Sequence, residues 1–214
     1  MIGRPIGVLG GTFDPVHVGH LRLALEAYER LNLETVRLIP LSNPNHRGPP
    51  VVAGQQRFEM LSRAIDGTSL IADDRELRRD GVSYTIQTLE SLRVDFAKQP
   101  LYLLLGADAF HGLCAWNRWQ DLLGLCHLVV VTRPNSDMPL DPRLQKLVDE
   151  VTTDDPDILA QDRFGRIFFL SVPMLPISST DIRRRLFLGK DISHLVPLSV
   201  QRFIAQNELY KGPS

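Results

Sequence analysis

The sequence predicts an α/β protein built on a doubly wound, mostly parallel sheet with helices on both faces. Short apolar runs alternate with segments of helical period along most of the 214 residues, a pattern typical of βαβ units. Several runs are apolar throughout, as expected for strands that helices cover on both faces. Because such sheets bind ligands beyond the carboxyl ends of their strands, we expect the functional site at that edge.

The predicted strands and helices follow one another in order. Six apolar runs are predicted to be strands, and apolar residues at spacings of three and four predict helices between them. The strands cover residues 6–9, 36–40, 69–72, 101–106, 128–132 and 167–172, and the helices cover 21–31, 58–65 and 86–96.

Two stretches interrupt this alternation. Residues 41–54 are rich in Pro, Asn and Gly and are predicted to form a long loop that acts as a mobile flap over a ligand. Residues 133–166 are polar and acidic and are predicted to be an insertion with a helix around 142–151. We therefore expect a single domain over residues 1–214, with this insertion and a C-terminal helical part at 180–210.

The composition excludes several classes of protein. A formal net charge of −1 gives no basic field that would attract nucleic acid. The apolar runs fall well short of the roughly 18 residues of a membrane span, and the first residues show no signal-peptide pattern. Cys114 and Cys126 lie outside any metal-ligand spacing and are expected to be reduced and buried. These features favour a cytoplasmic enzyme with neither nucleic acid nor a membrane as its partner.

The turn after the first predicted strand, GGTFDPVHVGH at residues 10–20, is the strongest indication of function. It leads into a helix, and the amides and positive dipole end of a helix N-terminus favour an anion. Gly10 and Gly11 carry no Cβ, which would let a phosphate approach the backbone closely. His17 and His20 are three residues apart and are expected on one face of a helical turn, where imidazole can donate to phosphate oxygens. The segment predicts a site for the phosphates of a nucleotide.

A second motif, PISSTDIRRR at residues 176–185, predicts another helix N-terminus. Hydroxyls and first-turn amides there can hold phosphate oxygens, and Arg183 adds a planar charged group. Arg184 and Arg185 are assigned to a solvated face. Two such N-termini that face each other would form a two-sided cradle for a polyphosphate.

With both motifs in view, the sequence resembles the HxGH nucleotidyltransferase superfamily, and in particular the bacterial nicotinate-nucleotide adenylyltransferases. The resemblance covers nearly the whole chain and includes DGVSYT at 80–85, GAD at 106–108 and WNRW at 116–119. It implies a Rossmann-like fold and the transfer of the adenylyl group of ATP to nicotinate mononucleotide, with nicotinate adenine dinucleotide and pyrophosphate as products. This chain departs from the family in having Leu41-Ser42 where Asn-Asn is often found.

The resemblance also implies roles for individual residues. His17 and His20 would be catalytic, with His20 at the α-phosphate. Asp108, after a strand end and a glycine, could hydrogen-bond a ribose hydroxyl. Mg²⁺ would bridge phosphate oxygens and keep most of its waters, so no dedicated protein ligand for a metal is expected. The ATP-binding residues would be Gly10, Gly11, Thr12, Phe13, His17, His20, Asp108, Ser178, Ser179, Thr180 and Arg183.

The acceptor, nicotinate mononucleotide, needs an aromatic clamp and donors for its carboxylate and phosphate. Trp116 would stack on the pyridine ring, as the resemblance implies. Tyr84 and Thr85, near a helix start, could offer backbone amides to the nicotinate carboxylate. His46 and Arg47, on the predicted flap, could meet the acceptor phosphate.

Two other interpretations stay open. The same chemistry could use nicotinamide mononucleotide, phosphopantetheine or another phosphate as its acceptor. From a different class, a nucleotide sensor would bind ATP without turning it over. The combination of His17, His20 and the Ser/Thr residues argues against a sensor, because binding alone would tolerate their loss better.

Overall fold

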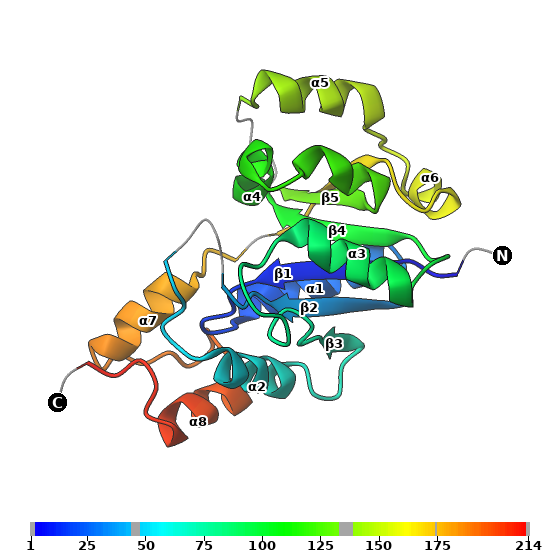
Figure 1. Cartoon of the computed structure of the whole chain (residues 1–214). Coiled ribbons are helices and arrows are strands. Elements are labelled where there is room, and N and C mark those ends of the chain that lie inside the picture. The colour runs from blue at the N-terminus through cyan, green and yellow to red at the C-terminus, as the bar shows by residue number, and fades with distance from the viewer. Residues whose placement is uncertain (1–2, 44–47, 133–138, 174, 213–214) are drawn as a thin grey trace. The chain divides into compact units, whose positions relative to one another are not determined.

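The computed structural model describes residues 3–43, 48–132, 139–173 and 175–212. In these ranges each of the six predicted strands is present, with ends that differ from the prediction by at most two residues. The strands are β1 (Ile6–Gly11), β2 (Thr35–Pro40), β3 (Leu70–Ala72), β4 (Leu101–Gly106), β5 (His127–Thr132) and β6 (Ile167–Ser171). They form one sheet in the order β3-β2-β1-β4-β5-β6 (Figure 1).

The pairing of the strands confirms the predicted doubly wound, Rossmann-like sheet. β1 pairs with β4 in parallel, with Ile6 opposite Leu101 and Val8 opposite Leu103. β4 with β5 and β5 with β6 are parallel as well. The strand order reverses between β1 and β4, and such a point is where sheets of this kind bind their ligands. The turn that follows β1 therefore starts at the expected edge.

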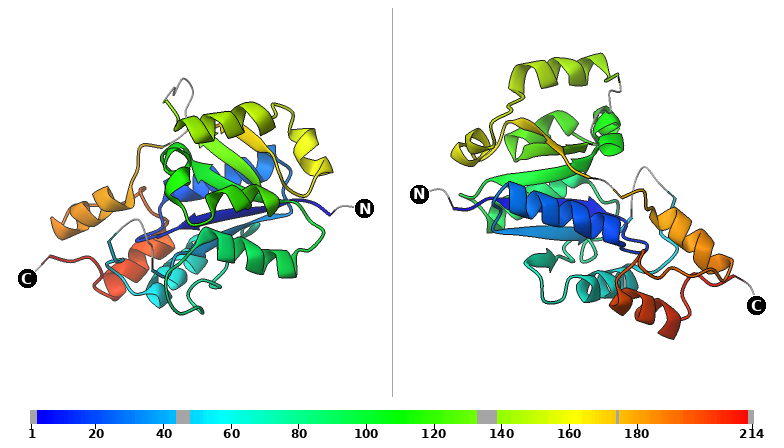
Figure 2. Two further views of the ribbon diagram at one scale, coloured as in Figure 1. Left: turned by 45° about the horizontal axis from the view of Figure 1, so that its top comes forward. Right: turned by 180° about the vertical axis from the view of Figure 1, so that it is seen from behind.

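Helices fill the connections between the strands. The helices predicted from periodicity are all found, together with the one expected around residues 142–151. Figure 1 shows α3 in front of β1 and β4, and the rear view in Figure 2 shows α1 over the opposite face. The helices are α1 (Val18–Arg30), α2 (Gly54–Ala64), α3 (Thr85–Asp95), α4 (Ala107–His111), α5 (Pro142–Val151), α6 (Pro156–Gln161), α7 (Ser179–Phe187) and α8 (Leu198–Gln206). None of these helices, within the described ranges, is long and apolar enough to cross a membrane.

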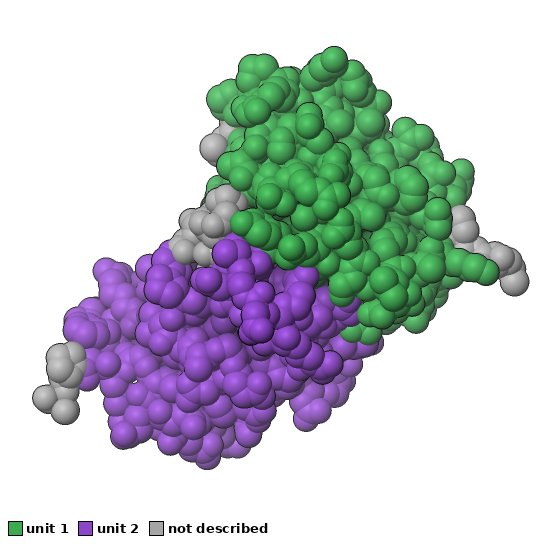
Figure 3. Space-filling view, viewed as in Figure 1, with its two compact units in different colours: residues 1–9, 25–37, 84–173 green, residues 10–24, 38–83, 174–214 purple. Residues whose placement is uncertain are grey.

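The chain forms two compact units, coloured separately in Figure 3. Both phosphate motifs predicted from the sequence, the turn at 10–20 and the segment at 176–185, belong to the second unit. The first unit comprises residues 1–9, 25–37 and 84–173, and the second comprises 10–24, 38–83 and 174–214. The expected division into one domain with an insertion stays a prediction.

The buried ring of His127 in the first unit has hydrogen-bond partners on both of its nitrogens. The ring of His127 accepts the amide of Arg166 at Nδ1, 3.2 Å away, and its Nε2 therefore donates to the carbonyl of Asp162 at 3.0 Å. Burial raises the pKa of the Cys126 thiol to about 12. Cys126 is buried as predicted, whereas the prediction of a buried Cys114 is wrong, because that side chain is only half-buried.

Arg93 on α3 ties several loops of the first unit together. Its Nε donates to the carbonyl of Leu125 at 2.7 Å and its Nη2 to that of Arg163 at 2.8 Å. Its Nη1 donates to the carbonyls of Gln99 at 2.6 Å and Phe96 at 3.1 Å. Only a guanidinium can donate to four carbonyls in these directions at once, so Arg93 stabilises the loops that carry these carbonyls.

We expect Arg93→Lys to lower the free energy of unfolding by about 2 kcal/mol, because an ammonium cannot reach all four carbonyls and those left over lose a charged donor. Chemical denaturation measures this change. The matched control is Arg143→Lys on α5, an exposed arginine paired with Asp141, where no measurable change in the free energy of unfolding is expected. Equal losses in the two variants would show that Arg93 has no special role.

Candidate functional site

The turn after β1 is shaped by a buried aromatic ring. Phe13 has a left-handed backbone with φ of 48° and is only 1% exposed. Its ring meets the ring of His20 edge-on, with centroids 5.0 Å apart. A Cβ on Gly11 would lie 3.0 Å from the Phe13 ring, whereas one on Gly10 would meet no described atom within 4 Å. The space beside Gly10 is therefore open, whereas a side chain at Gly11 would crowd the ring of Phe13. Contact of either glycine with a phosphate stays a prediction.

The two histidines lie together, as predicted. α1 begins at Val18, so His17 precedes the helix instead of lying inside it. Its carbonyl accepts the amides of His20 at 2.9 Å and Leu21 at 3.3 Å, which places His17 at the start of the first turn. The imidazole rings are stacked with centroids 3.7 Å apart. The amide of Val18 donates to the carbonyl of Leu195, so this part of the helix N-terminus is already bonded.

The contact between the histidines defines where His20 carries its proton. The amide of His17 donates to Nδ1 of His20 at 3.3 Å. A ring nitrogen that accepts a hydrogen bond has no proton, so the neutral ring of His20 is protonated at Nε2. The His20 Nε2–H group is therefore a donor without needing a charge on the ring.

His17 is the more buried of the pair. It is 6% exposed, and burial lowers its pKa to about 4. Its Nδ1 is buried and has no hydrogen-bond partner among the described residues. A Cβ on Gly19 would lie 3.0 Å from this nitrogen, so the glycine makes room for the ring. A desolvated imidazole of this kind is neutral near pH 7 and gains a proton more readily when an anion is close.

The N-terminus of α7 presents the predicted hydroxyl and guanidinium groups. Ser178 is the N-cap, and its Oγ accepts the amide of Asp181 at 3.1 Å. Thr180 accepts at Oγ1 from Nη2 of Arg183 at 3.2 Å, which leaves the hydroxyl hydrogen of Thr180 for another acceptor. Ser178 and Thr180 are exposed, so their hydroxyls are open to a ligand. Arg184, predicted to be solvated, is exposed and pairs with Asp181.

Two hydrogen bonds join α7 to the turn after β1. Ser179 donates from Oγ to the carbonyl of Pro15 at 2.9 Å, and Arg183 donates from Nη1 to the carbonyl of Asp14 at 2.7 Å. The two motifs that the sequence predicted to cooperate are thus in contact. Since the hydroxyl hydrogen of Ser179 is engaged by Pro15, this residue can offer a ligand only its helix-start amide.

Three buried residues next to the turn were missed as functional residues by sequence reasoning. In the sequence, Asp14 precedes Pro15, a pair that predicts only a bend in the chain, and nothing there assigns Arg57 or Tyr210 a functional role. Asp14, Arg57 and Tyr210 are 2%, 1% and 9% exposed. Burial, followed by the hydrogen bond to Asp14, raises the pKa of Tyr210. Arg57 could have been found, because it is a charge on the apolar face of α2 beside Met60 and Leu61.

Both described ends of the loop predicted at 41–54 are held by hydrogen bonds to neighbouring segments. The amide of Leu41 donates to the carbonyl of Gly11 at 2.9 Å, and Val51 donates to Oδ2 of Asp14 at 2.7 Å. The Ser42 amide donates to Oγ of Ser83 at 3.0 Å. His46 and Arg47 lie outside the described residues. Closure of this loop over a ligand stays a prediction.

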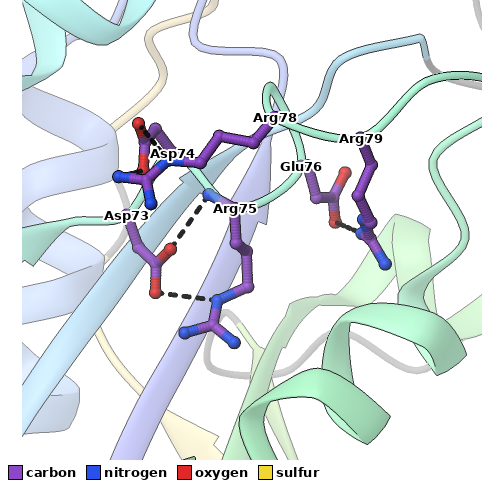
Figure 4. Close-up of polar contacts among 6 residues, drawn as sticks. All are labelled: Asp73, Asp74, Arg75, Glu76, Arg78 and Arg79. Atoms are coloured by element: carbon purple, nitrogen blue, oxygen red, sulfur yellow. Dashed lines mark hydrogen bonds and ion pairs between the residues drawn. The ribbon is translucent and has the colours of Figure 1, made fainter.

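A charged segment follows β3 in the second unit (Figure 4). Arg78 forms a two-pronged ion pair with Asp74, through Nε to Oδ2 at 2.8 Å and Nη2 to Oδ1 at 2.7 Å. Asp73 accepts both the amide and Nε of Arg75, at 3.1 and 2.9 Å. These contacts are made within one short stretch of chain, so they shape this loop and assign no ligand to it.

The remaining predicted residues belong to the first unit. Asp108 is exposed in the first turn of α4, directly after β4, as expected for a residue at a strand end. Tyr84 is the N-cap of α3 and Thr85 its first residue, which confirms that they lie at a helix start. Trp116 is half-buried and has an extended backbone after a short 3₁₀ turn. Contact of these residues with a ligand stays a prediction.

A metal centre was not found in the part of the chain that the structure describes. No group of three or more His, Cys, Asp or Glu side chains there could hold an ion. Apart from the buried Asp14 and Arg57, the side chains gathered at the turn are imidazoles, hydroxyls and the guanidinium of Arg183, which suit phosphate oxygens better than a hard cation.

Comparison with known proteins assigns the chain to a class. Residues 8–185, which span both motifs, match the family model described as cytidylyltransferase-like. The parallel sheet, the histidine turn and the α7 N-terminus are thus those of a nucleotidyltransferase of the cytidylyltransferase-like family.

Full-length relatives narrow this class. A protein of Pseudomonas putida strain GB-1 is 45% identical over 213 residues, which cover 99% of this chain and 97% of the relative. One from Pseudomonas fluorescens is 45% identical over 215 residues, and all of both chains is covered. Each is named "Probable nicotinate-nucleotide adenylyltransferase". The chain belongs to the nicotinate-nucleotide adenylyltransferase family.

Solved structures support the fold. A nicotinic acid mononucleotide adenylyltransferase of Plasmodium falciparum, complexed with NaAD, has a TM-score of 0.73 at 18% identity, over 97% of this chain and 98% of that one. The same enzyme complexed with APC has a TM-score of 0.70. Identity this low speaks for the architecture alone.

The burial of His17 predicts a pH dependence of stability. Its pKa of about 4 in the folded protein lies below the ordinary 6.5, so the unfolded chain binds this proton first as the pH falls. The free energy of unfolding should therefore be reduced by up to about 3 kcal/mol between pH 6.5 and pH 4, and His17→Asn should remove this part of the loss. Urea denaturation across this range measures it.

The control for this prediction is His194→Asn, in the same unit. His194 has a left-handed backbone with φ of 66°, which asparagine adopts readily. Because His194 is exposed, this variant makes the same substitution without removing a buried imidazole. If the pH dependence of stability is the same in His17→Asn as in His194→Asn, burial does not control the protonation of His17.

Proposed function

We propose that this protein transfers the adenylyl group of ATP to nicotinate mononucleotide, forming nicotinate adenine dinucleotide and pyrophosphate. The observation that carries the proposal is the contact between α7 and the turn after β1, where Arg183 and Ser179 bond to the carbonyls of Asp14 and Pro15. One unit thereby gathers imidazole, hydroxyl and guanidinium donors of the kind that bind polyphosphates. The names of the full-length relatives indicate the acceptor.

The chemistry needs positioning more than proton transfer. An oxygen of the acceptor 5′-phosphate forms a bond to the α-phosphorus of ATP, and the bond from that phosphorus to the bridging oxygen breaks as pyrophosphate leaves. The nucleophile is already an anion, so no strong general base is required. Negative charge builds on the α-phosphate and on the leaving group. His20, a donor at Nε2, would meet the α-phosphate, and His17 would take up a proton as the phosphates approach.

The triphosphate would lie between the two motifs. Thr180, Arg183 and the amides of Ser178 and Ser179, at the start of α7, would hold the β- and γ-phosphates at the positive end of the helix dipole. The backbone from Gly10 to Phe13 would contact the nucleotide, with the open side at Gly10 nearest the phosphates. Mg²⁺ would enter with ATP, bound by phosphate oxygens, and would neutralise part of their charge.

The nucleosides would be held by residues of other elements. Asp108 would accept from a ribose hydroxyl. Trp116 would stack on the pyridine ring, and the amides of Tyr84 and Thr85 would meet the nicotinate carboxylate at the start of α3. His46 and Arg47 would contact the acceptor phosphate. Soluble substrates of this kind fit a cytoplasmic enzyme.

The choice of acceptor is tested by comparing nicotinate and nicotinamide mononucleotides. We expect kcat/KM to be higher for nicotinate by about tenfold or more, because amide donors at the α3 start would favour a carboxylate over an uncharged amide. Release of pyrophosphate from Mg²⁺-ATP measures both rates. A preference for the amide would disprove the assigned acceptor, and no release with either would favour a nucleotide sensor.

A variant separates this acceptor from phosphopantetheine. Trp116→Ala should raise KM for nicotinate mononucleotide and leave KM for ATP nearly unchanged, because only the pyridine ring would stack on Trp116. Unimpaired turnover of this variant would favour an acceptor without an aromatic ring.

Transition-state binding by His20 is tested separately. His20→Ala should lower kcat by about a hundredfold and change the affinity for ATP by only a few fold, since the contact strengthens as charge develops on the α-phosphate. Steady-state rates and an ATP titration without acceptor measure the two effects. Equal losses in both would mean that His20 only binds the ground state.

A further inference from the structure

A buried polar network lies beside the phosphate turn and ends at the C-terminal part of the chain. It comprises Asp14 in the turn, Arg57 on α2 and Tyr210 after α8, all in the second unit and all less than a tenth exposed. Buried polar and charged groups of this kind are stable only when they are bonded to one another or to the backbone. Their partners therefore show what the network holds in place.

The side chain of Asp14 joins the turn to two distant segments. Its Oδ1 accepts the hydroxyl of Tyr210 at 2.6 Å, and its Oδ2 accepts the amide of Val51 at 2.7 Å. Tyr210 is 196 residues away in sequence and has a left-handed backbone with φ of 61°. The hydroxyl of Tyr210 thus forms a direct hydrogen bond between the C-terminal segment and the turn.

Arg57 supplies the charge that complements Asp14. It donates to the carbonyls of Thr12 at 2.6 Å, Leu41 at 2.7 Å and Val52 at 3.1 Å. Attraction to Asp14 partly offsets the effect of burial, which lowers the pKa of Arg57. The guanidinium of Arg57 therefore links Thr12 in the turn to Leu41 and Val52 in the loop predicted at 41–54. The carboxylate of Asp14 stays bonded to Tyr210 and Val51.

The backbone carbonyls of the same turn accept hydrogen bonds from the side chains of two α7 residues that we propose to bind phosphate. The carbonyl of Asp14 accepts from Arg183 at 2.7 Å, and the next carbonyl, that of Pro15, accepts from Ser179 at 2.9 Å. One residue, Asp14, is thus held by Tyr210 through its side chain and holds Arg183 through its main chain. A shift of Asp14 would move Arg183 with it.

We propose that Tyr210 is a positioning residue for adenylyl transfer: through its hydrogen bond to Asp14 it fixes the carbonyls to which Arg183 and Ser179 are bound, and so sets where these groups meet the triphosphate of ATP. This inference rests on the proposed use of ATP. Tyr210 is buried and acts through Asp14, so it is a positioning residue and not a catalytic one. Its burial raises the pKa of the phenol, so the hydroxyl remains a donor over the working pH range.

The test is Tyr210→Phe in the full chain, which keeps the buried ring and removes only the hydroxyl. We expect the Kd for Mg²⁺-ATP without acceptor, and kcat/KM for ATP, to worsen by about tenfold, while KM for nicotinate mononucleotide changes by less than about twofold. Tyr102→Phe is the matched control, since Tyr102 is a buried tyrosine, 1% exposed, on β4 in the other unit. It should leave both substrates unaffected.

A double-mutant cycle shows whether Tyr210 acts through Arg183. In an Arg183→Ala background, Tyr210→Phe should weaken ATP binding by less than about twofold, because the group it positions is gone. Asp14→Ala, which removes the acceptor of the Tyr210 hydroxyl, should reproduce the ATP-selective loss if Tyr210→Phe folds poorly.

Three outcomes would overturn the inference: ATP binding unchanged in folded Tyr210→Phe, equal losses for both substrates, or an undiminished effect in the Arg183→Ala background. The ATP titration needs no acceptor. A wild-type protein that binds ATP but adenylates no nicotinate mononucleotide would therefore refute the proposed function, and the binding cycle would still decide the role of Tyr210.

Discussion

The second unit depends on keeping a carboxylate and a guanidinium bonded while both are buried beside one turn. Asp14 meets this requirement through the hydroxyl of Tyr210 and the amide of Val51, and Arg57 meets it through three backbone carbonyls. Each partner comes from a different part of the chain. Removing one would leave a buried polar group unsatisfied, which costs far more than the hydrogen bond contributes. The turn, the C-terminal segment and the start of α2 are therefore fixed together.

The stacked rings of His17 and His20 in the same turn place a second constraint on charge. Their rings stack at 3.7 Å, and two positive charges at that distance would repel. The structure avoids this by burying His17, whose pKa falls to about 4, while Nδ1 of His20 accepts the amide of His17. A phosphate near the pair would reverse the balance and favour protonation of His17. The imidazole pair is thus prepared for an anion without two adjacent positive charges, and the guanidinium of Arg183 supplies the fixed charge beside it.

Much of the fold was predictable because its elements have strong local patterns. The central strands β4 and β5 are buried along nearly their whole length, and the stripes of α1, α2 and α3 repeat at helical spacing, so burial defines these elements well. The helix start at Ser178 followed from its N-cap chemistry. Asp14 was missed because its neighbour Pro15 offers a simpler explanation for a turn. Cys114 was misplaced because composition cannot tell a half-buried thiol from a buried one.

By itself, the sequence determined the order of the elements, the two phosphate motifs and the family, since each depends on neighbouring residues or on a spacing of a few positions. Only the tertiary structure decided which groups of those motifs remain available to a ligand. The hydroxyl of Ser179 donates to the carbonyl of Pro15 and is therefore not available to a phosphate. Gly11 leaves space for the ring of Phe13, and Tyr210 donates to Asp14, which is 196 residues away in sequence. These are contacts between segments distant in sequence, and they are set by packing and by the satisfaction of buried polar groups, neither of which has a local pattern.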